Sequence, residues 1–139
     1  MALFTDADDL YAHLGKLFQD AVVDPELAPA FMASNATIQY RLRGPEAQLT
    51  IRTVAGEEPQ VDFGASKLAP DVVVQMDADV AHRFWLGKVN PAIALARGDI
   101  RTRGSVAKVL ALIPLVKPVF PRYCAQLEAA GRQDLADVV

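Results

Sequence analysis

Apolar residues at the start of the chain recur with the period of a helix. Thr5 or Asp6 can cap this helix, because both side chains accept hydrogen bonds from the N–H groups of a first turn. The apolar residues that follow fall on one stripe: Leu10, Tyr11, Leu14, Leu17, Phe18, Ala21 and Val22. Asp24 and Pro25 then provide a new cap and a first-turn proline, which predict a short second helix over residues 25–33.

The next part of the chain alternates with a period of two, as strands with one wet face do. Residues 38–42, 49–53 and 61–63 place apolar side chains at every second position, and a Gly-Pro pair at 44–45 marks the first turn. Three such strands in a row predict an antiparallel meander. Residues 72–76 are apolar at nearly every position. This predicts a fourth strand in a central place, where both faces of the sheet are covered.

Glycine, asparagine and proline divide the second half into short elements. A helix capped by Asp77 ends at Gly87, and another begins at Asn90 and Pro91 and ends at Gly98. The remaining elements are a strand over residues 100–103, an apolar helix over 106–113, interruptions at Pro114, Pro118 and Pro121, and a last helix over 119–130. Helices and strands in this order predict an α+β fold.

The composition fits one domain and leaves apolar residues to spare. A chain of 139 residues suits a single domain over 1–139. Its 52% hydrophobic residues exceed the usual level of about 45–50%, and the mean hydropathy is +0.17. The surplus predicts an internal cavity, an interface or a membrane contact. The longest apolar stretch, residues 109–116, is too short to cross a bilayer. Because neither end carries a targeting signal, we expect a cytoplasmic protein.

The charges and reactive residues narrow the function further. A single cysteine, Cys124, rules out an intrachain disulfide, and His13 and His82 form no metal-ligand cluster with it, so we expect no metal and no cofactor. Residues 1–79 hold 5 basic and 13 acidic residues, whereas residues 80–139 hold 9 and 4. The excess of basic residues in the second half is small, and no aromatic motifs are interleaved with it, which argues against nucleic acid as a partner. Transient contact with an anionic membrane surface fits better.

The stretch over residues 71–112 resembles the core of sterol carrier protein 2 (SCP-2) domains. That family has an apolar strand, a helix ending in glycine, an Asp/Asn-Pro helix start, a last strand between two glycines, and an apolar helix. The matching positions are residues 72–76, Gly87, Asn90 with Pro91, Gly98, residues 100–103, Gly104 and residues 106–112. The meander before this stretch agrees with the strand order of the family, so the resemblance extends over most of the chain.

The resemblance implies a five-stranded mixed sheet, covered on one face by helices, with an apolar tunnel for a sterol, a fatty acyl chain or a similar lipid. It brings no catalytic residue. We therefore predict a protein that is not an enzyme and that binds and transfers or presents a sterol-like, fatty acyl or isoprenoid lipid. The alternative is a non-catalytic interaction module, which dimerises through residues 109–127 or serves a lipid-metabolising enzyme as an accessory subunit. A steroid-isomerase-like enzyme would need a paired acid and oxyanion donor, which the sequence does not suggest.

Large apolar residues of the second half are the candidates for the cavity wall, with ordinary core packing as the alternative. They are Phe84, Trp85, Leu86, Ile93, Val106, Val109, Leu110, Ile113, Leu115, Val116, Val119 and Phe120. Three prolines interrupt residues 114–123, and Lys108, Lys117 and Arg122 flank this segment. We interpret it as a lid whose cations reach lipid headgroups, although a stiff kinked connection would show the same pattern.

No reactive residue is placed to act as a catalyst. His82, near Trp85, is expected to be partly exposed or hydrogen-bonded rather than a general base, and Cys124 is expected to be a small buried hydrophobe. The acidic pairs at 8–9 and at 77 and 79 lie at helix starts, where the helix dipole favours carboxylates. Alternating strand positions turn three arginines outward, toward solvent or a partner: Arg41, Arg43 and Arg52.

Overall fold

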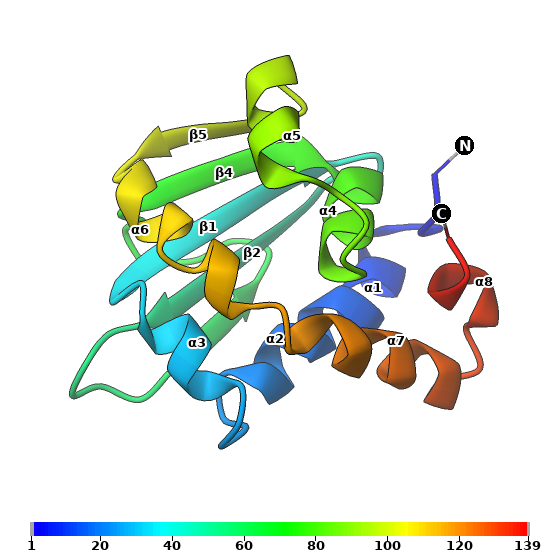
Figure 1. The fold of residues 1–139 in the computed structure, drawn as a ribbon, viewed down its shortest axis with the longest axis horizontal. Helices are drawn as coiled ribbons and strands as arrows, with labels where there is room; N and C mark the ends of the chain where they lie inside the picture. The colour runs from blue at the N-terminus through cyan, green and yellow to red at the C-terminus, as the bar shows by residue number, and fades with distance from the viewer. Residues whose placement is uncertain (1, 139) are drawn as a thin grey trace.

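A five-stranded mixed sheet forms the centre of the protein, as predicted. The computed structural model describes residues 2–138. The strands are β1 (Ala36–Arg43), β2 (Ala47–Thr53), β3 (Gln60–Phe63), β4 (Val72–Asp77) and β5 (Ile100–Gly104), in the order β3-β2-β1-β4-β5. β1 and β4 run parallel, and every other neighbouring pair is antiparallel. The predicted meander is therefore β1 to β3, and β4 lies next to β1 (Figure 1).

The alternation along the strands decides which face receives the helices. Ile38, Tyr40 and Leu42 of β1 are buried, and their register partners in β2 and β4 are also apolar. Arg41 and Arg43 point to the other side and are exposed. That second face is less exposed to solvent than the alternation predicts, because three polar residues in its middle are also buried: Thr37, Gln39 and Thr50. Their side chains are satisfied locally, since Gln39 Nε2 donates to Thr50 Oγ1 at 3.2 Å.

The helices lie in front of the sheet on one face (Figure 1). The first long helix is continuous and consists of α1 (Ala7–Leu10), the π-helical segment η1 (Tyr11–Gly15) and α2 (Lys16–Ala21); α3 (Ala28–Met32) follows. The second half contains α4 (Ala78–Trp85), α5 (Pro91–Arg97), α6 (Val106–Leu110), the 3-10 turn η2 (Ile113–Leu115), α7 (Val119–Ala129) and α8 (Gln133–Ala136).

Several predicted helix boundaries agree with the structure, but the helix expected over residues 25–33 is shorter, because Asp24 caps a turn and α3 begins only at Ala28. Asp6 caps the first helix by accepting from Asp9 N at 2.8 Å, and Asn90 caps α5 by accepting from Ala92 N and Ile93 N. The apolar helix expected over residues 106–113 is shorter, because α6 ends at Leu110 and Pro114 lies in η2. The sequence also gave no sign of α8, whose four residues carry no helical period.

An aromatic cluster joins three helices to the middle of the sheet. Phe18 of α2 packs edge-to-face on Trp85 of α4 at 5.0 Å and stacks on Tyr40 of β1 at 5.6 Å, and Phe31 of α3 stacks on Trp85 at 6.0 Å. Aromatic pairs in these geometries contribute about 0.5–1.5 kcal/mol each beyond the area they bury. This cluster holds α2, α3 and α4 in place, whereas α5, α6 and η2 lie outside it.

Candidate functional site

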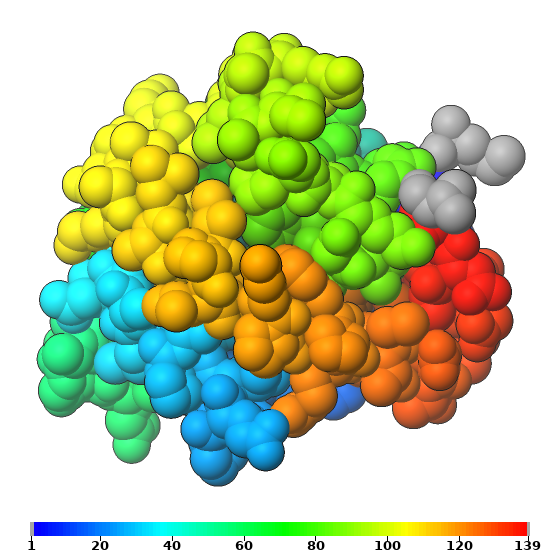
Figure 2. Space-filling model, viewed as in Figure 1, coloured from blue at the N-terminus to red at the C-terminus, as the bar shows by residue number. Residues whose placement is uncertain are grey.

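An apolar pocket lies between the sheet and the helices of the second half. Its volume is about 50 Å³. Figure 2 shows the surface on this side, with a recess between the yellow-green α5 and the yellow α6. The pocket is lined by Tyr40, Val74, Met76, Phe84, Trp85, Pro91, Leu95, Ile100, Thr102, Val106, Val109, Leu110, Leu112, Ile113 and Val116. The sheet forms the floor, and α4, α5, α6 and η2 form the walls.

The lining of the pocket is apolar apart from two hydroxyl groups. Tyr40 and Thr102 provide them, and no charged side chain lines the pocket. Burial raises the pKa of Tyr40, so its hydroxyl stays neutral at physiological pH. Such a pocket can hold apolar groups by removing them from water, but it offers no counter-ion to a charged ligand atom.

The structure brings part of the predicted cavity wall together. The predicted residues that line the pocket are Phe84, Trp85, Val106, Val109, Leu110, Ile113 and Val116. Phe84 and Trp85 come from the last turn of α4, while the others come from α6 and the turns that follow it. Trp85 also belongs to the aromatic cluster, so this residue both packs in the core and lines the pocket.

Five predicted wall residues do not line the pocket, for three reasons. Ile93 and Leu115 lie on the outer sides of α5 and η2, where about half of each side chain is exposed. Val119 is completely buried in the core. Leu86, at the C-cap of α4, packs against the core, and Phe120 packs over Gly87 and against Phe84 at 6.0 Å. A helical period identifies apolar residues, but it does not identify which part of the core they face.

The floor of the pocket is the part that the sequence analysis missed. It consists of residues on the helix-facing side of the strands, Tyr40, Val74, Met76, Ile100 and Thr102. The period of two had already placed Tyr40 on the apolar face of its strand, whereas residues 72–76 were predicted to be covered on both faces. The sequence did not indicate that α5 and α6 leave a space above these floor residues. Pro91, Leu95 and Leu112 complete the lining that was not predicted.

The predicted tunnel is not seen as an open passage. A volume of about 50 Å³ is well below the roughly 300–1,000 Å³ of typical ligand pockets. Contact between apolar walls removes apolar surface from water, which stabilises a small pocket. The structure therefore has the walls of an apolar site in a nearly closed arrangement.

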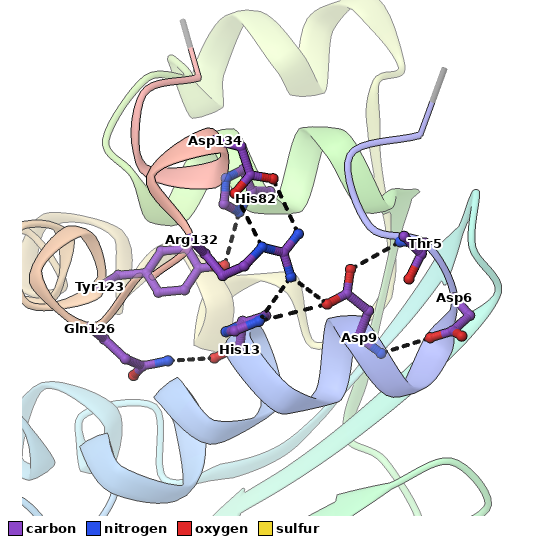
Figure 3. Close-up of polar contacts among 9 residues, drawn as sticks. All are labelled: Thr5, Asp6, Asp9, His13, His82, Tyr123, Gln126, Arg132 and Asp134. Atoms are coloured by element: carbon purple, nitrogen blue, oxygen red, sulfur yellow. Dashed lines mark hydrogen bonds and ion pairs between the residues drawn. The ribbon is translucent and has the colours of Figure 1, made fainter. Parts of the chain in front are cut away.

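A buried polar cluster holds the C-terminal helices against α4 (Figure 3). His82 of α4 is buried and makes two hydrogen bonds, to Tyr123 Oη and to the Leu135 carbonyl, both at 2.8 Å. Because a carbonyl oxygen can only accept, Nε2 of the neutral ring donates to Leu135, and Tyr123 donates to Nδ1. His82 was predicted to be either partly exposed or hydrogen-bonded, and it is hydrogen-bonded. It is not exposed and does not line the pocket.

Arg132 connects the same region to the first helix (Figure 3). It donates to Asp9 Oδ1 at 2.6 Å, to Asp134 Oδ1 at 3.1 Å, and lies 3.1 Å from His13 Nε2. The hydrogen bond from Arg132 lowers the pKa of Asp134. Asp9 also accepts from Thr5 N, so this carboxylate serves the start of the helix and a tertiary ion pair together. These contacts indicate that the polar cluster stabilises the packing of the helices.

The other reactive residues have structural surroundings too. Cys124 is partly buried rather than buried, and its Sγ donates to Glu128 Oε1 at 3.5 Å. Burial raises the pKa of this thiol, which disfavours the nucleophilic thiolate. Asp79 accepts from Leu3 N at 3.0 Å, whereas Asp77 pairs with Arg43 instead of capping α4 with its side chain. Within residues 2–138, no three His, Cys, Asp or Glu side chains gather as a metal site would require.

Acidification below about pH 6.5 is expected to destabilise the protein through His82. Burial lowers the pKa of His82 in the folded state below its ordinary value of 6.5. The unfolded chain therefore takes up a proton at a higher pH than the folded chain, and the free energy of unfolding falls as the pH drops below 6.5. Urea titrations at pH 7 and pH 5 would measure this effect.

Variants separate the contribution of His82 from that of the other histidine. His82→Gln is expected to be less stable at pH 7 but to lose less stability on acidification than the wild type. His13→Gln is the matched control, since burial and Arg132 lower the pKa of His13 as well. A wild-type protein that is equally stable at both pH values would contradict this assignment.

Comparisons with known proteins agree with this architecture. The chain is similar to the apo form of sterol carrier protein 2 from Yarrowia lipolytica, with a TM-score of 0.64 and 20% identity over 86% of this chain and 98% of that one. It is similar to palmitated SCP2L2 from Aedes aegypti, with a TM-score of 0.56 and 16% identity over 78% and 94% of the two chains. The UbiJ-SCP2 ubiquinone synthesis protein gives 0.54 and 17% over 76% and 90%.

Sequence comparison identifies the family. No curated protein matches the sequence. None of the helices described within residues 2–138 has the length and apolarity needed to cross a bilayer. The profile of the SCP-2 sterol transfer family matches residues 14–117, which include the whole sheet and every element around the pocket up to η2. The match covers most of the chain, and the chain therefore belongs to the SCP-2 sterol transfer family.

Proposed function

We propose that this protein binds the apolar part of a lipid between α6 and the sheet and carries or presents it without chemical change. The observation that carries this proposal is the pocket, whose lining contains no charged residue and only two hydroxyl groups. Membership of the SCP-2 family supports a lipid as the ligand. The palmitated state of the similar Aedes aegypti structure supports an acyl chain as one class of ligand.

Binding requires the pocket to open, and α6 with η2 is the wall most free to move. Neither element contains a buried residue, although both contribute to the lining. The ends of this wall are fixed, because Gly104 pairs with Val72 in the sheet and Val116 is buried. Between the two elements, Leu112 is the one buried residue of residues 105–115, and it lines the pocket. Outward movement of this segment would take Leu112 with it and enlarge the pocket while leaving the aromatic cluster intact.

This assignment moves the lid from its predicted place. The sequence pointed to residues 114–123, but Val116, Val119 and Tyr123 within that segment are buried. Arg122 forms ion pairs with Asp24 and Glu26, so it is held against the connection between α2 and α3. The three prolines therefore lie in or next to a connection that is anchored in the core. The segment that we propose to open, residues 105–115, ends before Pro118 and Pro121.

The lining also limits the chemistry of the ligand. An ionised carboxylate or phosphate inside the pocket would lose its hydration without gaining a counter-ion. We therefore place an acyl chain or another apolar portion inside, with any charged headgroup at the mouth. Tyr40 and Thr102 can donate to one neutral polar group, such as a hydroxyl or a carbonyl.

Gently purified protein is expected to carry a co-purified lipid that native mass spectrometry can identify. Delipidated protein should bind a fluorescent fatty acid, and hydrogen exchange at residues 105–115 should slow when the probe binds. Residues 116–123 are expected to be protected in both states, because Val116, Val119 and Tyr123 anchor this segment in the core. Repeated absence of a lipid adduct together with no uptake of the probe would overturn the proposed function.

A further inference from the structure

Exposed apolar side chains lie on the elements that form the walls of the pocket. They are Ile93 of α5 (49% exposed), Val106 (37%) and Leu110 (47%) of α6, and Leu115 (45%) of η2, and we call these four residues the α5–α6 rim. Within the described part of the chain, Val23 is the one other large hydrophobic residue with such exposure. Val106 and Leu110 also line the pocket, so the rim is continuous with its interior.

The charges around the rim are mainly positive. Residues 91–122 contain one acidic residue, Asp99, and four basic residues outside β5: Arg97, Lys108, Lys117 and Arg122. Arg101 and Arg103 of β5 point to the opposite face of the sheet from Ile100 and Thr102, which line the pocket. Arg122 is neutralised by Asp24 and Glu26, and Lys108 Nζ donates to the Asn35 carbonyl at 3.2 Å. Arg97 at the end of α5 and Lys117 after η2 are exposed. The chain as a whole has a net charge of −3, so the positive charge is local.

We propose that the α5–α6 rim docks on the surface of an anionic lipid bilayer, with the pocket mouth facing the membrane. Half-exposed apolar side chains at helix surfaces gain free energy when they enter the boundary between headgroups and acyl chains. Cations near that surface are attracted by the anionic lipids, each by roughly fivefold in affinity. The proposal rests on the proposed function, because docking would let an apolar ligand pass between bilayer and pocket without crossing water.

A bilayer fits this patch better than a protein does. A stable protein interface involves about 20–30 residues on each side, many more than the four of the rim. A bilayer needs only a few apolar side chains with cations beside them, which is the arrangement seen here. The headgroup of a bound lipid would also lie near Arg97 and Lys117, outside a pocket that has no counter-ion for it.

Vesicle sedimentation tests the docking separately from ligand binding. The wild type is expected to bind phosphatidylcholine vesicles that contain phosphatidylglycerol, and to bind pure phosphatidylcholine vesicles more weakly. The rim variant Ile93→Glu should bind the anionic vesicles at least tenfold more weakly. Ile93 neither lines the pocket nor lies in residues 105–115, so the uptake of a fluorescent fatty acid from solution by this variant should remain unchanged. Val23→Glu is the matched control, and it should bind vesicles as the wild type does.

A second variant tests the electrostatic part. Arg97→Gln with Lys117→Gln should reduce binding to the anionic vesicles roughly 25-fold, at fivefold for each cation, and should affect binding to pure phosphatidylcholine vesicles little. The proposal is overturned if the wild type binds neither vesicle, or if the rim variant and Val23→Glu bind equally. It is also overturned if the wild type forms a dimer that the rim variant abolishes, since the rim would then be a contact between two copies. Failure of fatty acid uptake in the wild type would instead remove the proposed function.

Discussion

Replacing Gly104 with alanine is expected to lower the free energy of unfolding by roughly 3–5 kcal/mol, which combines backbone strain with overpacking. Gly104 ends β5 with φ of +99°, a region that L-residues rarely adopt. A Cβ at this position would lie 2.3 Å from the Asp71 carbonyl oxygen and 3.2 Å from Val72 Cα. Both neighbours are backbone atoms, so no side-chain rotation can relieve the contact.

The surroundings of Asp71 prevent the backbone from giving way. Its carbonyl accepts from Ser105 N at 3.1 Å, its own N donates to the Thr37 carbonyl at 2.8 Å, and its Oδ2 accepts from Thr37 N at 2.8 Å. Asp71 is therefore fixed to β1 on one side and to the start of α6 on the other. Movement of this residue would disturb the sheet and the wall of the pocket together.

A matched glycine separates the two causes of the loss. Gly98 also has a positive φ, +80°, but a Cβ there would meet no atom within 4 Å. Gly98→Ala should therefore cost only about 1–2 kcal/mol, the price of the backbone conformation alone. Urea denaturation of both variants and the wild type would measure the difference. Equal losses for the two variants would show that the contact with Asp71 does not matter.

Filling the pocket is expected to weaken lipid binding at least tenfold. Val109 lines the pocket from α6 and is partly buried. An indole at this position, in the variant Val109→Trp, would occupy the space that the acyl chain needs, and it would pack against Tyr40 and Trp85 in its place. A tenfold loss corresponds to about 1.4 kcal/mol, less than the gain from burying a few methylene groups. Titration with a fluorescent fatty acid would measure the affinity.

The control for this experiment adds the same side chain outside the pocket. Ile93 lies on the neighbouring helix α5, is about half exposed and does not line the cavity. Ile93→Trp is expected to bind the fatty acid as the wild type does. If both tryptophan variants bind it equally well, the ligand does not occupy the space beside Val109, and the proposed site is wrong.

Periodicity accounts for how well the elements were predicted. The stripe from Leu10 to Val22 and the alternation in residues 38–42 report local geometry, which neighbouring residues along the chain determine. The punctuation at Gly87, Asn90 and Gly98 is local as well, and the structure places helix ends there. The π-helical segment and α8 were missed because neither has a distinct local signal.

The candidate site was harder to predict, because a wall is defined by what lies opposite to it. Ile93 and Leu115 are as apolar as the residues that line the pocket and lie in the same elements, yet they face solvent. His82 illustrates the same limit. Its partners, Tyr123 and the Leu135 carbonyl, are 41 and 53 residues away in the sequence, so nothing near His82 indicates that it is buried and paired.

The sequence by itself determined the order and type of most elements, the family resemblance, and the absence of any motif for a catalyst. The elements follow from hydrophobic period, caps and turn residues, which act over a few residues, and the resemblance rests on the order and spacing of those elements. Only the tertiary structure decided which apolar residues form the core, which line a nearly closed pocket and which lie exposed on the elements that form its walls. All three groups are equally hydrophobic, and they differ only in the distant segments that pack against them.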